Sequence, residues 1–127
     1  MQEKLLFEYA VVRLMPRVER EEFMNTGVVL YCPKQRFLKA RIEVNEARLD
    51  AFCTTCDVDA VKEHLQAFGR ICQGGRGTGP IGQLPIAERF RWLTAMRSTV
   101  VQTSRVHPGF CEDAEAMLDR LYEGLVL

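Results

Sequence analysis

The chain has 127 residues and a formal net charge of +0, because 17 basic side chains balance 17 acidic ones. Its composition is 47% hydrophobic and 27% charged, which is the balance of a globular protein with one core and excludes a disordered chain. The zero net charge argues against attraction of the whole chain to DNA or to an anionic membrane.

The first 44 residues are predicted to form three strands. Residues 6–14 alternate apolar and polar side chains with the period of two that is typical of a half-buried strand. Residues 22–32 are rich in β-branched and aromatic side chains and predict a second strand. After a turn at residues 33–35, the alternation returns over residues 36–44. The sequence therefore predicts a three-stranded antiparallel meander.

The apolar period then changes to that of helices. Asn45 can cap a short helix that runs to Phe52, and a second helix should begin near Asp57 and end at Gly74. Residues 73–85 contain five glycines and two prolines. This composition is too rich in turn residues for regular structure, so we expect a flexible, glycine-rich surface loop.

The last third of the chain predicts two helices and one strand. Pro85 is placed to open a helix that runs to Met96, and residues 98–104 are short and β-branched, as in a strand. The final helix has acidic residues in its first turn and one apolar stripe, formed by Ala114, Met117, Leu118, Leu121, Tyr122 and Leu125. We expect a single α+β domain over residues 1–127, with a four-stranded, mostly antiparallel sheet and three to four helices packed on one face.

The sequence predicts neither a secretory signal nor a membrane span. Glu8 ends the first apolar run too early for a signal, and the longest uncharged stretches fall below the ~18–20 apolar residues of a span. Five cysteines, an odd number, indicate reduced thiols. We therefore expect a cytoplasmic protein with no membrane partner.

The densest polar cluster of the sequence connects the first two predicted strands. It brings guanidinium, carboxylate and amide groups together within fifteen residues: Arg13, Pro16, Arg20, Glu22, Asn25 and Gly27. A guanidinium binds a carboxylate or a phosphate through its planar fork, and Glu22 could orient it. Alternatively, Arg–Glu pairs hold the connection together, Asn25 accepts a turn conformation and Gly27 relieves crowding. The structural interpretation is the better supported of the two.

These residues, together with Tyr9, resemble the opening signature of a bacterial family, domain of unknown function 3037. That signature reads Y-x3-R-x2-P-x3-R-G-E-x2-N-x-G and precedes an apolar strand; Glu21 stands here where the family usually has glycine. Residues 97–104 and Gly109 are similar to the family as well, so the resemblance covers most of the chain. It implies no established chemistry. It does imply a protein partner, expected to be a HipA-like kinase-type protein encoded nearby.

The second candidate is a charge asymmetry that the zero total conceals. Residues 70–105 carry six arginines and one glutamate, an excess of +5, whereas residues 112–123 carry five acidic residues and one arginine, an excess of −4. Arginines beside an aromatic ring suit an anion or a single-stranded nucleic acid. The candidate residues are Arg70, Arg76, Arg89, Arg91 and Trp92. Alternatively, the acidic helix faces the basic segment and neutralises it within the fold.

Four further residues are of the types that bind zinc. Cys53 and Cys56 form a C-x-x-C, and His64 and Cys72 follow. There is no second C-x-x-C in the sequence, and Cys72 fits the apolar stripe of the second predicted helix, so burial explains it equally well. We predict no metal site and no cofactor.

Three functions follow from these candidates. The leading one is a non-catalytic accessory or adaptor domain that binds a protein partner, presenting the polar cluster and the glycine-rich loop. The alternative is an anion-binding or single-stranded nucleic-acid binding module that uses residues 70–105. The third is a small phosphate-handling enzyme built on the polar cluster. No catalytic residue is assigned.

Overall fold

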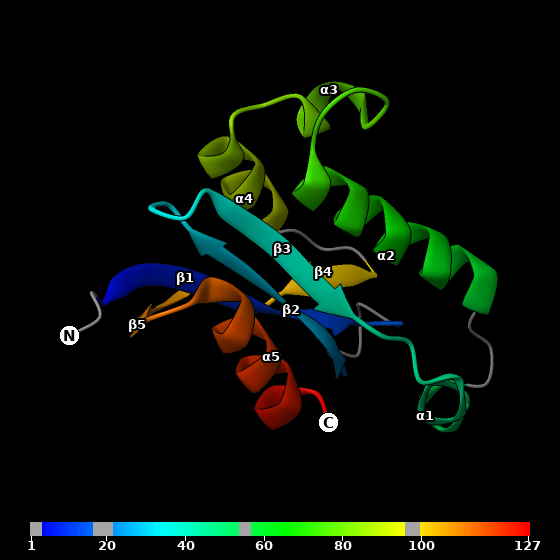
Figure 1. The fold of residues 1–127 in the computed structure, drawn as a ribbon. Coiled ribbons are helices and arrows are strands. Elements are labelled where there is room, and N and C mark those ends of the chain that lie inside the picture. Colours follow the sequence, from blue (N-terminus) through cyan, green and yellow to red (C-terminus); the bar gives the residue numbers. More distant parts are fainter. Residues whose placement is uncertain (1–3, 17–21, 54–56, 96–99) are drawn as a thin grey trace.

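A computed structural model describes residues 4–16, 22–53, 57–95 and 100–127 (Figure 1). The strands are β1 (Leu5–Leu14), β2 (Met24–Cys32), β3 (Phe37–Ile42), β4 (Val101–Thr103) and β5 (His107–Cys111). The helices are α1 (Glu46–Phe52), α2 (Val58–Gln73), α3 (Gly79–Gly82), α4 (Ile86–Thr94) and α5 (Ala114–Leu125). The expected α+β class with an antiparallel sheet is confirmed.

The predicted meander is present and forms one half of the sheet. β1 pairs antiparallel with β2, with Val11 opposite Val28, and β2 pairs antiparallel with β3, with Val29 opposite Ala40. The turn between β2 and β3 closes through a hydrogen bond from the Arg36 N–H to the Pro33 carbonyl oxygen (3.1 Å). The alternation of side chains predicted β1 and β3, and the β-branched and aromatic residues predicted β2.

The other neighbour of β1 is made of two consecutive pieces instead of the single predicted strand. β4 pairs with residues 12–14 and β5 with residues 5–9, both antiparallel, so the sheet order is β3-β2-β1 followed by β4 and β5 on one side of β1. The break falls at buried Ser104. Its N–H donates to the Val11 carbonyl (2.8 Å), and its hydroxyl accepts from the Val11 N–H (2.9 Å). The serine side chain thus replaces the missing backbone acceptor.

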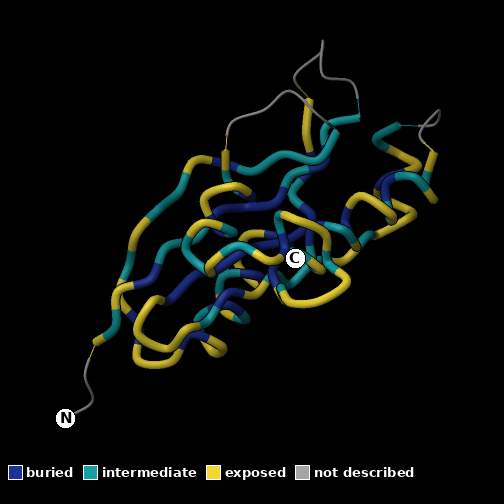
Figure 2. Tube along the Cα trace, turned by 90° about the horizontal axis from the view of Figure 1, so that it is seen from above, coloured by how far each residue is buried: buried dark blue, intermediate teal, exposed yellow. Residues whose placement is uncertain are grey.

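Helices cover both faces of the sheet, so the prediction that they pack on a single face is wrong. On one face, α2 and α4 bury Phe68, Phe90 and Leu93 against the sheet, whereas on the other face α5 buries Leu118 and Tyr122 (Figure 1). The physical reason is that β2 is buried along nearly its whole length, on both faces. Figure 2 shows the buried residues gathered along the middle of the fold and the exposed ones on its outside.

The helix boundaries follow the predicted signals. The side chains of Asn45 and Asp57 cap α1 and α2 by accepting from backbone N–H groups three residues later, both at 3.1 Å. Gly74 ends α2 with a φ of +69°. The segment 73–85 contains α3, so the expectation of no regular structure there is wrong, and its flexibility stays a prediction. No helix in the described ranges is long and apolar enough to cross a membrane.

Candidate functional site

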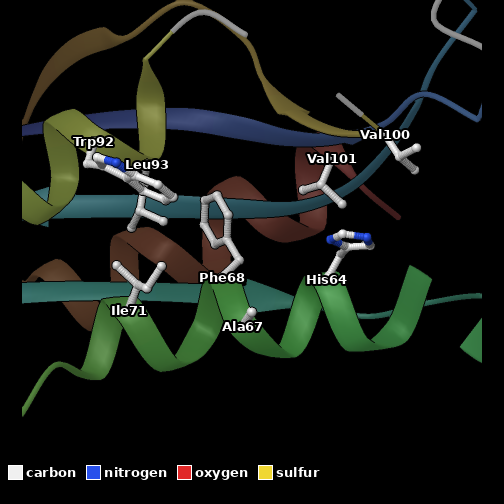
Figure 3. A pocket seen from close by; sticks show the side chains of 8 residues that line it. All are labelled: His64, Ala67, Phe68, Ile71, Trp92, Leu93, Val100 and Val101. Atoms are coloured by element: carbon white, nitrogen blue, oxygen red, sulfur yellow. The ribbon is translucent and has the colours of Figure 1, made fainter. Parts of the chain in front are cut away.

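An apolar groove lies between α2 and α4 and has a volume of about 450 Å³ (Figure 3). α2 contributes His64, Ala67, Phe68 and Ile71, a spacing that places all four side chains along one stripe of the helix. Across the groove, α4 contributes Trp92 and Leu93, and residues 100–101 close it at the level of β4. The groove is therefore built from three segments that are distant in sequence.

The two side chains with ring nitrogens, His64 and Trp92, lie at opposite ends of the groove. His64 lies beside residues 100–101, and Trp92 lies beside Leu93 at the end where Ile71 emerges from α2 (Figure 3). Trp92 is 37% exposed, which is unusual for the largest apolar side chain of a small domain. The arrangement can bury apolar side chains of another molecule, and the exposed His64 ring at one end can form a hydrogen bond with it.

Arg13 and Asn25 of the polar cluster make contacts that serve the fold. Arg13 lies opposite Asn25 where the β1–β2 register shifts, and its guanidinium stacks over the ring of Phe23 at 4.2 Å. The Asn25 side-chain N–H donates to the carbonyl oxygen of Leu125 (3.0 Å) and so attaches β2 to the end of α5. These contacts support the structural interpretation of the sequence signature.

Steric crowding between β2 and β3 requires glycine at position 27. An added Cβ would lie 2.6 Å from Ile42 Cγ1 and 2.7 Å from the Arg41 carbonyl oxygen. It follows Thr26, the extra residue at the register shift, whose hydroxyl donates to the Glu43 carbonyl oxygen (2.7 Å). β2 and β3 therefore approach one another too closely for any side chain at this position.

Of the remaining members of the cluster, the structure describes Pro16 and Glu22. Pro16 is half-buried at the end of β1 and Glu22 is exposed before β2, while Arg20 lies outside the described residues. The Arg13 Nε and the Asn25 Oδ1 are buried, and neither has a hydrogen-bond partner in the described part of the chain. Arg13 and Asn25 are opposed residues of β1 and β2, so this unsatisfied donor and acceptor belong to the same part of the sheet.

The arginine-rich segment divides into one internal arginine and several exposed ones. Arg89 donates from Nε to the Leu84 carbonyl (3.0 Å) and from Nη1 to the carbonyls of Ile71 (3.0 Å) and Cys72 (2.8 Å). It therefore caps the end of α2 and is not available to a ligand. In contrast, Arg70, Arg76 and Arg91 are exposed and form no ion pair with another described residue.

The acidic helix does not neutralise this segment, so that alternative is wrong. α5 packs on the opposite face of the sheet, where Glu115 pairs with Lys39 (2.7 Å) and Asp119 pairs with Arg41 (3.1 Å). Within residues 70–105, the described part carries five arginines and one glutamate, an excess of +4 along this stretch of the sequence. On α2 itself, Lys62 and Arg70 are balanced by Asp59 and Glu63.

The zinc candidates do not come together. Cys72 lies in the core and His64 in the groove, and Cys56 lies outside the described residues. Burial raises the pKa of the Cys72 thiol to about 12, and the nearby Arg89 only partly opposes that rise. No group of three or more metal-binding side chains occurs among the residues that the structure describes.

We expect Cys72 to resist alkylation by iodoacetamide near pH 8 in the folded protein and to react after unfolding, as read by mass spectrometry. Because the folded pKa lies above the ordinary value of 9.0, the unfolded thiol ionises first. Its contribution to the free energy of unfolding is present below pH 9 and decreases as the pH rises from 9 towards 12. Equal labelling rates in buffer and in urea would contradict this.

The groove could not be found from the sequence signals that were used. In α2 the core residues Phe68 and Cys72 form one apolar stripe, and Ala67 and Ile71 widen this stripe towards α4. An apolar stripe wider than one packed helix face requires indicates a second contact surface on the same helix. Trp92 was singled out, but as a platform for nucleic acid.

Comparisons with known proteins identify one family. A family model described as "Protein of unknown function (DUF3037)" matches residues 9–126 of the chain. Searches of the curated proteins and of the solved structures give no match.

Proposed function

For this chain, which belongs to the DUF3037 family of proteins of unknown function, we propose the role of a non-catalytic accessory or adaptor domain that binds a partner protein. The observation that carries the proposal is the apolar groove between α2 and α4, with Trp92 at its rim. Tryptophan and arginine are the residues that most often dominate the binding energy of protein interfaces.

The charge of this side defines the partner segment that fits the groove. Arg70 precedes Ile71, and Arg91 precedes Trp92, so exposed guanidiniums adjoin two residues that line it. Glu63 and Glu88 are also exposed on these two helices, so the positive charge is local to Arg70 and Arg91. The occupant that fits is an apolar segment with acidic residues placed against these two arginines, in which the charges steer association and the apolar side chains fill the groove. A HipA-like kinase-type protein is the first partner to test.

The two other functions receive less support. Exposed Arg70, Arg76 and Arg91 keep a nucleic-acid or anion-binding role open, but Arg89 is engaged inside the fold. A phosphate-handling enzyme would need Arg13 and Asn25 to face one ligand, but Arg13 stacks on Phe23 and does not line the small pocket of about 180 Å³ that Asn25 borders.

The test places a charge in the groove without removing any core side chain. Ala67→Glu keeps a good helix former in α2 and points a carboxylate at the apolar surface. We expect it to weaken binding of the partner at least about tenfold, because a desolvated, unpaired charge is costly in an interface. Gln73→Glu, an exposed position of the same helix, is the matched control and should bind normally.

The measurement begins with capture of partners by the tagged protein from a native extract, with nuclease added to half of the sample. A protein that survives nuclease is then purified and titrated against the wild type and the two variants. Loss of affinity in Ala67→Glu alone supports the proposal. Loss of captured material on nuclease treatment favours the nucleic-acid module, and equal affinity for all three proteins excludes the groove.

A further inference from the structure

In the part of the chain that the structure describes, the outer edge of the sheet at β3 has hydrogen-bonding groups without a strand partner. There β3 pairs with β2, and the hydrogen bond from the Glu43 N–H to the Thr26 carbonyl (3.0 Å) shows which residues of β3 direct their backbone groups towards β2. Because these residues alternate in an antiparallel pair, the N–H and C=O groups of Leu38, Ala40 and Ile42 point away from β2. They form a short template for another strand.

A groove runs beside this edge and gives an added strand room for its side chains. It has a volume of about 370 Å³ and lies between β3 and α2, with Ala40 and Ile42 on the strand side and Leu65 and Gly69 on the helix side. A Cβ added at Gly69 would meet no atom within 4 Å, so the helix side is open there. Small apolar side chains at alternate positions of an added strand would lie in this groove.

The opposite face of β3 carries cations at the alternate positions. Lys39 and Arg41 are 54% and 36% exposed, and each forms a surface ion pair with α5. The Arg41 guanidinium also lies over the ring of Tyr122, 4.2 Å from its centroid. If two copies of the chain joined their β3 edges antiparallel about Ala40, Lys39 of one copy would lie opposite Arg41 of the other. Like charges directly opposite one another destabilise a strand pair, so the edge disfavours a second copy and favours an acidic strand.

We propose that the edge of β3 binds an extended segment of a partner protein as an added strand, in which acidic residues alternate with small apolar ones. The acidic residues lie beside Lys39 and Arg41, the apolar ones enter the groove towards α2, and the main chain bonds to Ala40 and Ile42. This surface lies on the opposite side of α2 from the stripe at His64 and Ile71, so the proposal does not depend on the proposed function.

The test uses two capped peptides as probes, Glu-Val-Glu-Val-Glu-Val-Glu and its lysine counterpart Lys-Val-Lys-Val-Lys-Val-Lys. Titration followed by backbone NMR should show saturable shifts at the amides of residues 38–42 with the acidic peptide, and binding at least about tenfold weaker with the basic one. Methylation of the acidic peptide's backbone nitrogens should abolish binding, because it removes the donors of the added strand. The outcome contradicts the proposal if both peptides bind equally, if neither binds, or if the shifts centre on α4.

Variants of the protein separate the two parts of the recognition. Ala40→Pro removes an outward N–H without breaking the ladder to β2, so it should keep the fold and lose the acidic peptide. The double variant Lys39→Glu, Arg41→Glu should reverse the preference towards the basic peptide. Arg91→Glu on α4 is the matched charge control and should bind as the wild type does. If Arg91→Glu, and not the double variant, reversed the preference for the acidic peptide, this peptide would bind near α4 and the proposal would be wrong.

Discussion

Gly27→Ala is expected to lower the free energy of unfolding by about 3 kcal/mol, although it adds only one methyl group. The new Cβ would lie 2.7 Å from the Arg41 carbonyl oxygen and 3.1 Å from Ile42 Cα. These are backbone atoms of β3, and they can move away only if the β2–β3 ladder is distorted. Because a domain of this size is stabilised by about 5–15 kcal/mol in total, the loss is large.

Urea unfolding followed by circular dichroism measures this effect. Gly69→Ala is the matched control, because that glycine lies within α2 and its added Cβ would meet no atom within 4 Å. The control should raise the free energy of unfolding by about 0.5–1 kcal/mol, as alanine does in a helix interior. The same substitution is thus expected to act with opposite signs at the two sites. A stabilising Gly27→Ala would show that β2 and β3 are not in close contact.

Arg89→Met is expected to destabilise the protein by about 3 kcal/mol, even though arginine is usually a surface residue. Its side chain donates to the carbonyls of Ile71, Cys72 and Leu84, and so joins the end of α2 to the start of α4. Gly74, with a φ of +69°, leaves the space that the guanidinium occupies. Methionine can replace the aliphatic stem but leaves the carbonyls without their donor.

Thermal unfolding of Arg89→Met and Arg91→Met tests whether the two arginines differ in this way. Arg91 lies two residues away on the same helix and is exposed, so its replacement should change stability by less than about 0.5 kcal/mol. Since α2 and α4 are the walls of the groove, Arg89→Met should also change the fluorescence of Trp92 in the folded state. Equal effects of the two substitutions would mean that the cap at the end of α2 contributes little.

The elements of the fold were predictable where the signal is local. The period of two predicted β1 and β3, and the β-branched and aromatic residues predicted β2. The side chains of Asn45 and Asp57 marked the starts of α1 and α2, because caps act within one turn. β5 was missed because it contains Pro108 and Gly109, which are depleted from strands and are held here only by pairing with β1. That pairing joins residues about a hundred positions apart and leaves no local trace.

The sequence does contain a signal that helices pack on both faces of the sheet. Residues 28–32 are apolar without interruption, and such a run is typical of a strand buried on both faces. The candidate site was harder to predict from the sequence, because the groove depends on how α4 packs on α2. Likewise, Arg89 and Arg91 look alike in the sequence, and only the fold shows that one is an internal cap and the other is exposed.

The central strand β1 obtains its two neighbours from opposite ends of the chain, and this shapes the order of folding. β2 and β3 follow β1 closely and can form hairpins as soon as they leave the ribosome, whereas β4 and β5 arrive about ninety residues later. During that interval one side of β1 remains unpaired and open to other nascent chains. The strands that close the sheet on this side are thus synthesised long after the meander, and truncation near residue 100 would yield a meander with an exposed edge.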